Sequence, residues 1–207
     1  MRYEKQHKAA IRQRIVDMAA LRFRSEGIAA VGIANLMADL GLTHGGFYWH
    51  FKDKEDLVSA VCRQAMQQMN EQWQQHVQRA PVGQQRLSVA QHYLSVLHRD
   101  FPDTGCVAAA LAGELGRNGS QARQAFTDGL SQQLDTLSQA AQLDEAAGAS
   151  ALPAEAQLCL MVGALLLSRT VTDPELSSRL LRQAEALIGR HAVAQALATS
   201  QAIPPQD

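Results

Sequence analysis

The chain has 207 residues, of which 46% are hydrophobic and 5% aromatic, and a formal net charge of −1, as expected of a globular protein with one or two domains. Its first residues are too polar for a signal peptide and its longest apolar run, 158–167, is too short to span a bilayer, so we expect a cytosolic protein without a membrane segment. Three cysteines at wide spacing favour neither a disulfide framework nor a metal site, and nothing in the sequence predicts a cofactor.

The amino-terminal 54 residues are basic and the rest of the chain is acidic. Residues 1–54 contain nine Lys and Arg against five Asp and Glu, a local charge of +4 that leaves −5 for the remainder, and they hold every lysine. A basic end on an acidic body is typical of a nucleic-acid-binding module carried by another domain. Chance clustering of surface charge would give the same asymmetry, so this interpretation also needs a motif.

The first predicted helix runs from about Lys8 to Gly27. Its apolar residues recur on one face and its arginines lie on the other, and Gly27 supplies the residue that ends it. The preceding arm, Met1–His7, is expected to be a frayed terminus or, alternatively, to reach a neighbouring minor groove.

Residues 33–57 predict two short helices joined by a tight turn, followed by a third helix starting at Asp53. Gly41 provides a left-handed position that ends the first of these helices, and the hydroxyl of Thr43 caps the next. That second helix, about 43–51, starts with small or polar residues and ends with aromatic residues that are expected to pack. This arrangement favours a helix-turn-helix, whose second helix enters the major groove by its amino-terminal residues.

The stretch GLTHGGFYWHFKDKEDL resembles the DNA-binding signature of the TetR/AcrR family of one-component transcriptional regulators, and the resemblance extends over about Ile11 to Val61. It implies an all-α protein. Residues 1–54 would form a three-helix helix-turn-helix DNA-binding domain, and residues 55–207 a helical ligand-binding and dimerisation domain whose first helix, 55–80, links the two. Gly32 stands where the family usually has Ser or Thr, so a capping hydroxyl able to touch phosphate is missing.

The candidates for DNA contact are polar or small residues at the predicted reading helix and just after it. They are Thr43, His44, Gly45, Tyr48, His50 and Lys54. The two residues at the helix start can meet a base edge or a phosphate, whereas Gly45 keeps the backbone close to the groove. For His50, DNA contact and a core role are equally open, and Phe47 and Phe51 are expected in the core.

Five further helical segments are expected beyond the linking helix, over residues 84–100, 106–117, 120–143, 154–171 and 174–198. The fourth is apolar almost all round, so a second subunit is expected to cover part of it. The resemblance implies dimerisation through the last two long helices, and the candidate interface residues are Leu158, Met161, Leu165, Leu176, Leu180 and Leu187. A purely intramolecular core is the alternative.

The candidates for effector binding combine bulk with polarity or softness on apolar stripes. They are Trp73, His92, Tyr93, Leu97, Phe126 and Met161, and each is alternatively plain core. Cys106 follows a helix-breaking turn at the start of a helix, where a thiolate is favoured, and its surroundings are similar to those of TetR-like repressors that sense electrophiles or oxidants. A buried, inert thiol is the alternative. Cys62 and Cys159 are expected in the core.

The sequence therefore predicts a homodimeric repressor rather than an enzyme, with a palindromic double-stranded DNA operator and a small hydrophobic or electrophilic effector as partners. Two other functions stay open. One is a thiol-dependent enzyme that uses Cys106 with His92 or His98, and the other is a TetR-like adaptor without DNA binding.

Overall fold

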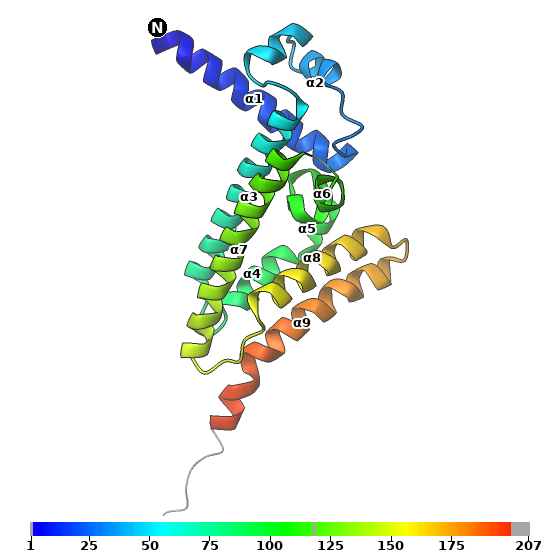
Figure 1. The fold of residues 1–207 in the computed structure, drawn as a ribbon. Coiled ribbons are helices and arrows are strands. Elements are labelled where there is room, and N and C mark those ends of the chain that lie inside the picture. The colour runs from blue at the N-terminus through cyan, green and yellow to red at the C-terminus, as the bar shows by residue number, and fades with distance from the viewer. Residues whose placement is uncertain (1, 118, 200–207) are drawn as a thin grey trace, which may run out of the picture. The chain divides into compact units, whose positions relative to one another are not determined.

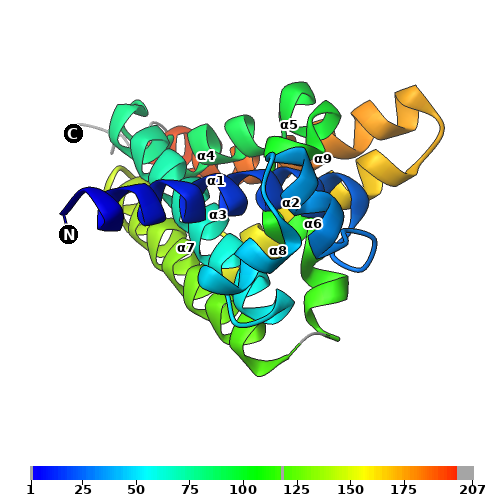
Figure 2. The ribbon, with the colours of Figure 1, turned by 90° about the horizontal axis from the view of Figure 1, so that it is seen from above.

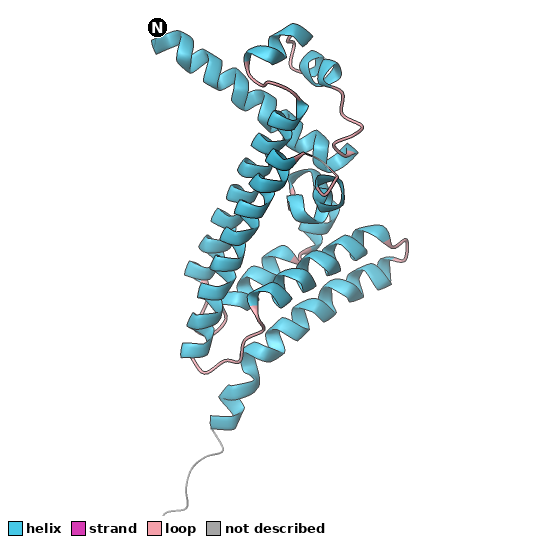
Figure 3. Cartoon of the chain, in the orientation of Figure 1, coloured by secondary structure: helices cyan, strands magenta, loops and turns pink. Residues whose placement is uncertain are grey.

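The computed structural model describes residues 2–117 and 119–199, with side chains for residues 6–117 and 119–190. Throughout these ranges the secondary structure is helical and contains no strand (Figure 3), which confirms the all-α prediction. The chain divides into two compact units. The first unit comprises Met1–Met69 and Phe101–Leu130, and the second comprises Asn70–Asp100 and Ser131–Asp207. The predicted functional division after residue 54 remains a prediction.

The first unit brings together elements from two separate stretches of sequence (Figure 1). Its elements are α1 (Arg2–Glu26), α2 (Ile33–Asp39), the 3-10 helix η1 (His44–Trp49), the beginning of α3 (Lys54–Arg79), the 3-10 helix η2 (Pro102–Thr104), α6 (Val107–Leu115) and the beginning of α7 (Ser120–Ala146). Both α2 and α6 lie against α1 (Figure 2), and η2 contacts α1 as well. One apolar core therefore joins the residues around η1 to Leu111 and Leu115 of α6.

Two glycines of this unit end helices as expected. Gly27 has φ +88° and follows α1, and Gly41 has φ +70° and closes the turn after α2. This left-handed region carries a steric cost for residues with a Cβ atom.

Three boundaries differ from the sequence-based expectations. The backbone of α1 begins at Arg2, so the expected arm is helical from that residue on. The second helix of the helix-turn-helix is a six-residue 3-10 helix. The predicted helix over 84–100 is two helices, α4 (Gln85–Tyr93) and α5 (Val96–Asp100), because the Ser95 hydroxyl accepts a hydrogen bond from the His98 N–H and starts a new helix.

The second unit contains the remainder of α3 and α7 with α4, α5, α8 (Ala154–Thr170) and α9 (Pro174–Thr199). In this unit α9 packs on α8 and α4, and α5 packs on α8. A buried ion pair between Arg86 and Asp144 fastens α4 to α7 at 2.8 Å. Within the described part of the chain, no helix is both long and apolar enough for a membrane crossing.

Candidate nucleic-acid interface

Local hydrogen bonds fix both ends of the turn that carries η1. The Thr43 hydroxyl accepts a hydrogen bond from the Gly46 N–H at 3.2 Å, which confirms Thr43 as the amino-terminal cap. Asp53 caps α3 by accepting from the Asp56 N–H at 2.9 Å, and the Asp56 carboxylate accepts in return from the Lys52 N–H at 3.2 Å. This reciprocal pair resembles a capping box shifted by one residue. Hydrogen bonds between residues close in sequence thus fix the backbone around η1.

The front of η1 is open to solvent and its back is anchored in the core. Thr43, His44 and Gly45 are exposed, and Tyr48 is 58% exposed. Phe47 and Phe51 are buried as expected, and their rings stack with centroids 5.4 Å apart. The two buried rings hold the helix so that its first residues project outward, which is the arrangement that major-groove reading requires.

Trp49 departs from the expectation that the aromatic end packs, since it is 76% exposed. In a 3-10 helix three consecutive side chains point in three directions, so only one of residues 47–49 can enter the core. Phe47 takes that place. Trp49 is therefore an exposed aromatic at the candidate DNA surface that sequence reasoning had assigned to packing.

The other two predicted contact residues, His50 and Lys54, are half-buried. Burial, followed by the charges of Lys8 and Arg12, lowers the pKa of His50. Burial also lowers the pKa of Lys54, whereas the nearby charge of Glu114 raises it. Lys54 thus lies beside a carboxylate of α6.

Lys8 and Arg12 are basic residues of this surface that the sequence-based site omitted. They are four residues apart on α1 and so share one helix face. The guanidinium carbon of Arg12 lies 4.6 Å from the centroid of the Phe51 ring. The spacing of the two residues was visible in the sequence, but their proximity to His50 depends on tertiary packing.

The predicted effector residues fall into both units. Trp73, His92, Tyr93 and Met161 belong to the second unit, whereas Cys106 and Phe126 belong to the first. Trp73 and Tyr93 are fully buried and meet edge to face at 5.7 Å. His92 is half-buried and stacks on His76 with ring centroids 4.3 Å apart. Leu97, by contrast, is 72% exposed, so it does not line a cavity of this chain.

The three cysteines have different surroundings. Cys106 is 1% exposed at the amino-terminal cap of α6, within electrostatic range of Arg24 of α1. Cys62 is buried, and desolvation raises the pKa of its thiol to about 12. Cys159 is exposed, so its expected place in the core was wrong. The apolar character of α8 on all sides had concealed which of its faces is covered.

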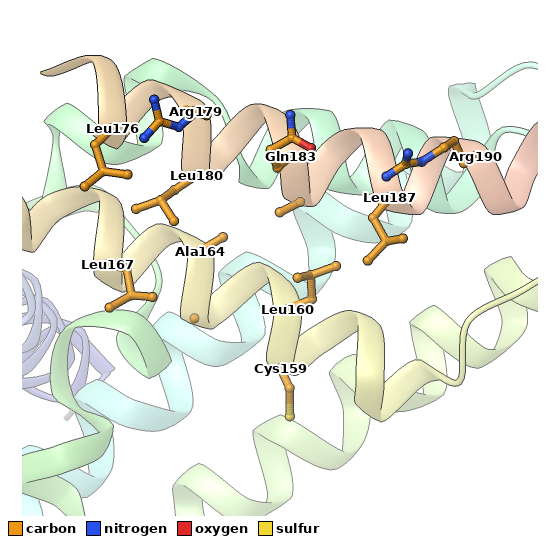
Figure 4. A pocket seen from close by; sticks show the side chains of 12 residues that line it. Cys159, Leu160, Ala164, Leu167, Leu176, Arg179, Leu180, Gln183, Leu187 and Arg190 are labelled. Carbon is orange, nitrogen blue, oxygen red and sulfur yellow. The ribbon is translucent and has the colours of Figure 1, made fainter.

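The candidate dimer-interface residues also differ in their exposure to solvent. Leu158, Met161 and Leu165 are buried within the chain, which corrects their expected place on an exposed face. Leu176, Leu180 and Leu187 line an open apolar groove of about 600 Å³ between α8 and α9 (Figure 4), and Leu160 and Leu167 line it from α8. These five leucines therefore form the accessible apolar face of the two helices.

Comparison with known proteins identifies the amino-terminal region. Residues 15–61 match the family described as bacterial regulatory proteins, tetR family. The regulator AcrR of Shigella flexneri is 38% identical over 60 residues, which are 29% of this chain and 28% of AcrR. The regulator TtgR of Pseudomonas putida is 33% identical over 61 residues, 30% of this chain and 29% of TtgR. These matches span less than a third of either relative.

Solved structures share the fold over most of the chain. The reduced form of E. coli NemR has a TM-score of 0.75 and 20% identity, and the comparison covers 87% of this chain and 96% of NemR. AibR, solved in complex with isovaleryl coenzyme A and operator DNA, has a TM-score of 0.65 and 16% identity, with 86% and 97% covered. At these identities the similarity establishes the common fold.

Proposed function

We propose that this protein, whose residues 15–61 match the tetR family of bacterial regulatory proteins, is a homodimeric, sequence-specific DNA-binding transcriptional repressor. A small molecule, or an electrophile or oxidant reacting at Cys106, would release it from a palindromic operator. The observation that carries the proposal is the exposed front of η1 held on a buried aromatic anchor.

In this proposal the front of η1 reads the major groove. His44 contacts a base edge and Tyr48 donates its hydroxyl to a phosphate, while Gly45 allows close backbone approach. The Thr43 hydroxyl accepts from the Gly46 N–H, and its own proton stays available to a phosphate oxygen. His50 and Lys54 would add contacts to the DNA backbone at the rear of the helix.

The groove between α8 and α9 supports a dimer. Among the described side chains it combines five leucines with small residues such as Gly163, where a Cβ atom would meet nothing within 4 Å. A groove of this kind favours close packing of a second copy. Two copies would place two reading helices about 34–36 Å apart on a palindrome.

The response to an effector would act through residues 101–130, because they pack in the same unit as the helix-turn-helix. Arg24 of α1 donates a hydrogen bond to the Asp103 carbonyl, next to the Cys106 turn. Glu114 of α6 accepts from the Ala29 N–H, in the loop between α1 and α2, at 3.1 Å. Displacement of η2 or α6 would therefore move α1 and the adjoining loop directly. AibR, which was solved with both a coenzyme A thioester and operator DNA, gives a precedent for an effector in this fold.

Selection of bound sequences from random duplexes, followed by fluorescence anisotropy, tests the proposal. The full-length protein should enrich a palindrome, and His44→Ala should weaken binding to it much more than to unselected duplex. Cys106→Ser should keep operator affinity and remove release by a thiol-reactive electrophile. A monomer that selects no sequence would refute the proposal. Release that persists in Cys106→Ser would refute only the role of the thiol.

A further inference from the structure

Three basic side chains from distant parts of the sequence gather behind η1. Lys8 and Arg12 come from α1, and His50 directly follows η1. Arg12 is fixed over the Phe51 ring at 4.6 Å, and ring contact of this kind orients a guanidinium. The charges that act on His50 are those of Lys8 and Arg12, and both disfavour its protonation. The next charged residues in the chain, Lys52 and Asp53, are exposed.

The cluster lacks an anion in the part of the chain that the structure describes. No described carboxylate forms an ion pair with Lys8 or Arg12. The Nδ1 atom of His50 is buried without a hydrogen-bond partner. Like charges held within interaction range repel one another, and a bound anion removes that repulsion. A cluster of two permanent cations and one titratable ring therefore suits a phosphate group.

The position of the cluster indicates which phosphate it would meet. His50 is the residue after Trp49, which is exposed, and two residues after Tyr48, which is a proposed phosphate contact. The cluster thus continues the proposed DNA surface from η1 onto α1. An operator phosphate beside η1 is therefore the ligand that we assign to the three groups.

We propose that Lys8, Arg12 and His50 form a binding site for a DNA backbone phosphate, and that occupation of this site is coupled to protonation of His50. This inference rests on the proposed DNA-binding function. In the free protein, burial and then the charges of Lys8 and Arg12 lower the pKa of His50, so its protonated form is disfavoured. The negative charge of a phosphate at the site opposes the repulsion from Lys8 and Arg12 and raises that pKa. DNA affinity should therefore increase as the pH falls toward about 6, with uptake of a proton by each subunit.

The alternative is a solvated basic face, as found on many helices. That alternative predicts no link between DNA affinity and protonation beyond general screening. It also predicts that loss of Arg12 has the same effect as loss of any other surface arginine. The two interpretations consequently differ in measurable ways.

The test uses the full-length protein and its selected duplex, with affinity measured by anisotropy between about 50 and 200 mM salt at about pH 6 and pH 8. Lys8→Gln and Arg12→Gln should each reduce the slope of log affinity against log salt by about 1 per subunit, equally for specific and unselected duplex. His50→Gln should reduce the pH dependence relative to the wild type while keeping a hydrogen-bond donor. Arg123→Gln, the loss of an exposed arginine elsewhere in the first unit, is the matched control and should change neither quantity.

The site is refuted if the Lys8 and Arg12 variants have the same salt slope as the wild type and Arg123→Gln. A pH dependence in His50→Gln equal to that of the wild type overturns the coupling to protonation of His50. Wild-type protein that binds no duplex overturns both the site and the proposed function. If the wild-type protein binds its duplex sequence-specifically but the Lys8 and Arg12 variants keep its salt slope, the site is refuted and the proposed function stands.

Discussion

Replacement of Asp144 by alanine should destabilise the second unit strongly. The Asp144 carboxylate is fully buried and accepts hydrogen bonds from the Gln85 N–H at 2.7 Å and from the Arg86 N–H at 3.2 Å. It also pairs with the Arg86 guanidinium at 2.8 Å, where the two side chains are 0% and 1% exposed. One carboxylate thus serves as the cap of α4 and as the counter-ion of a buried cation.

The expected loss of stability follows from the interactions that Arg86 keeps and loses when Asp144 is replaced. In Asp144→Ala, Arg86 keeps its hydrogen bond to the Ser150 carbonyl at 2.7 Å but loses its counter-ion. Removal of one partner of a buried ion pair typically costs about 3–5 kcal/mol. For a protein of this size that corresponds to a decrease in Tm of roughly 6–20 °C.

Thermal and denaturant unfolding followed by circular dichroism measures the effect, and a double-mutant cycle with Arg86→Met isolates the pair. The double variant should be less destabilised than the sum of the single variants by more than about 1 kcal/mol. Glu26→Ala is the control, because Glu26 pairs with Arg22 in a partly exposed i, i+4 arrangement, and solvent screening makes the contribution of such a pair much smaller than that of a buried pair. A loss below about 1 kcal/mol in Asp144→Ala, or strict additivity, would refute the reasoning.

Three other expectations follow from the glycines and cysteines. Gly27→Ala should cost about 1–2 kcal/mol, since φ is +88° and the new Cβ atom would lie 2.8 Å from a Glu114 carboxylate oxygen. Gly113→Ala, at an exposed helical position with open space around it, should instead stabilise by about 0.5–1 kcal/mol; equal effects of the two changes in chemical denaturation would contradict this. Gly45→Ala should leave the melting temperature unchanged, because nothing lies within 4 Å of the new Cβ atom. It should nevertheless weaken operator binding roughly tenfold, since in the proposed complex the methyl group would face the groove; unchanged anisotropy titrations would show that Gly45 does not approach DNA. Cys159, which lines the groove between α8 and α9, should be alkylated before Cys62 in a native time course followed by mass spectrometry, and more slowly in the proposed dimer than in the monomer, with Cys62 modified only on unfolding. Because the folded-state pKa of Cys62 is raised to about 12 from 9.0, its contribution to folding stability is present below about pH 9 and is lost as the pH rises towards about 12; faster labelling of Cys62 than of Cys159 would contradict both statements.

Features determined within a few residues could be predicted from the sequence. The left-handed turn at Gly41 and the caps provided by Thr43 and Asp53 each depend on one residue and its near neighbours. The length of η1 could not be predicted, because Gly45 and Gly46 have weak helix propensity and the aromatic run after them gives no helical period.

Features that depend on packing between distant segments were missed or misplaced. On α8 nearly every residue is apolar, so periodicity could not show that Leu158, Met161 and Leu165 face inward while Cys159 faces outward. The approach of Lys8 and Arg12 to His50 likewise requires that α1 passes close to the end of η1. Contacts of this kind have no local signature in a single sequence.

The discontinuous first unit limits how this protein can be recombined with other regulators. Phe47 and Leu57 share one core with Leu111 and Leu115, which lie in the separate stretch Phe101–Leu130. A chimera made with a single crossover after residue 69 would discard α6, leaving apolar surface bare and the Ala29 N–H without the acceptor it has in Glu114. A chimera must therefore take both Met1–Met69 and Phe101–Leu130 from this protein. Fusions that contain both stretches should retain a folded DNA-binding domain.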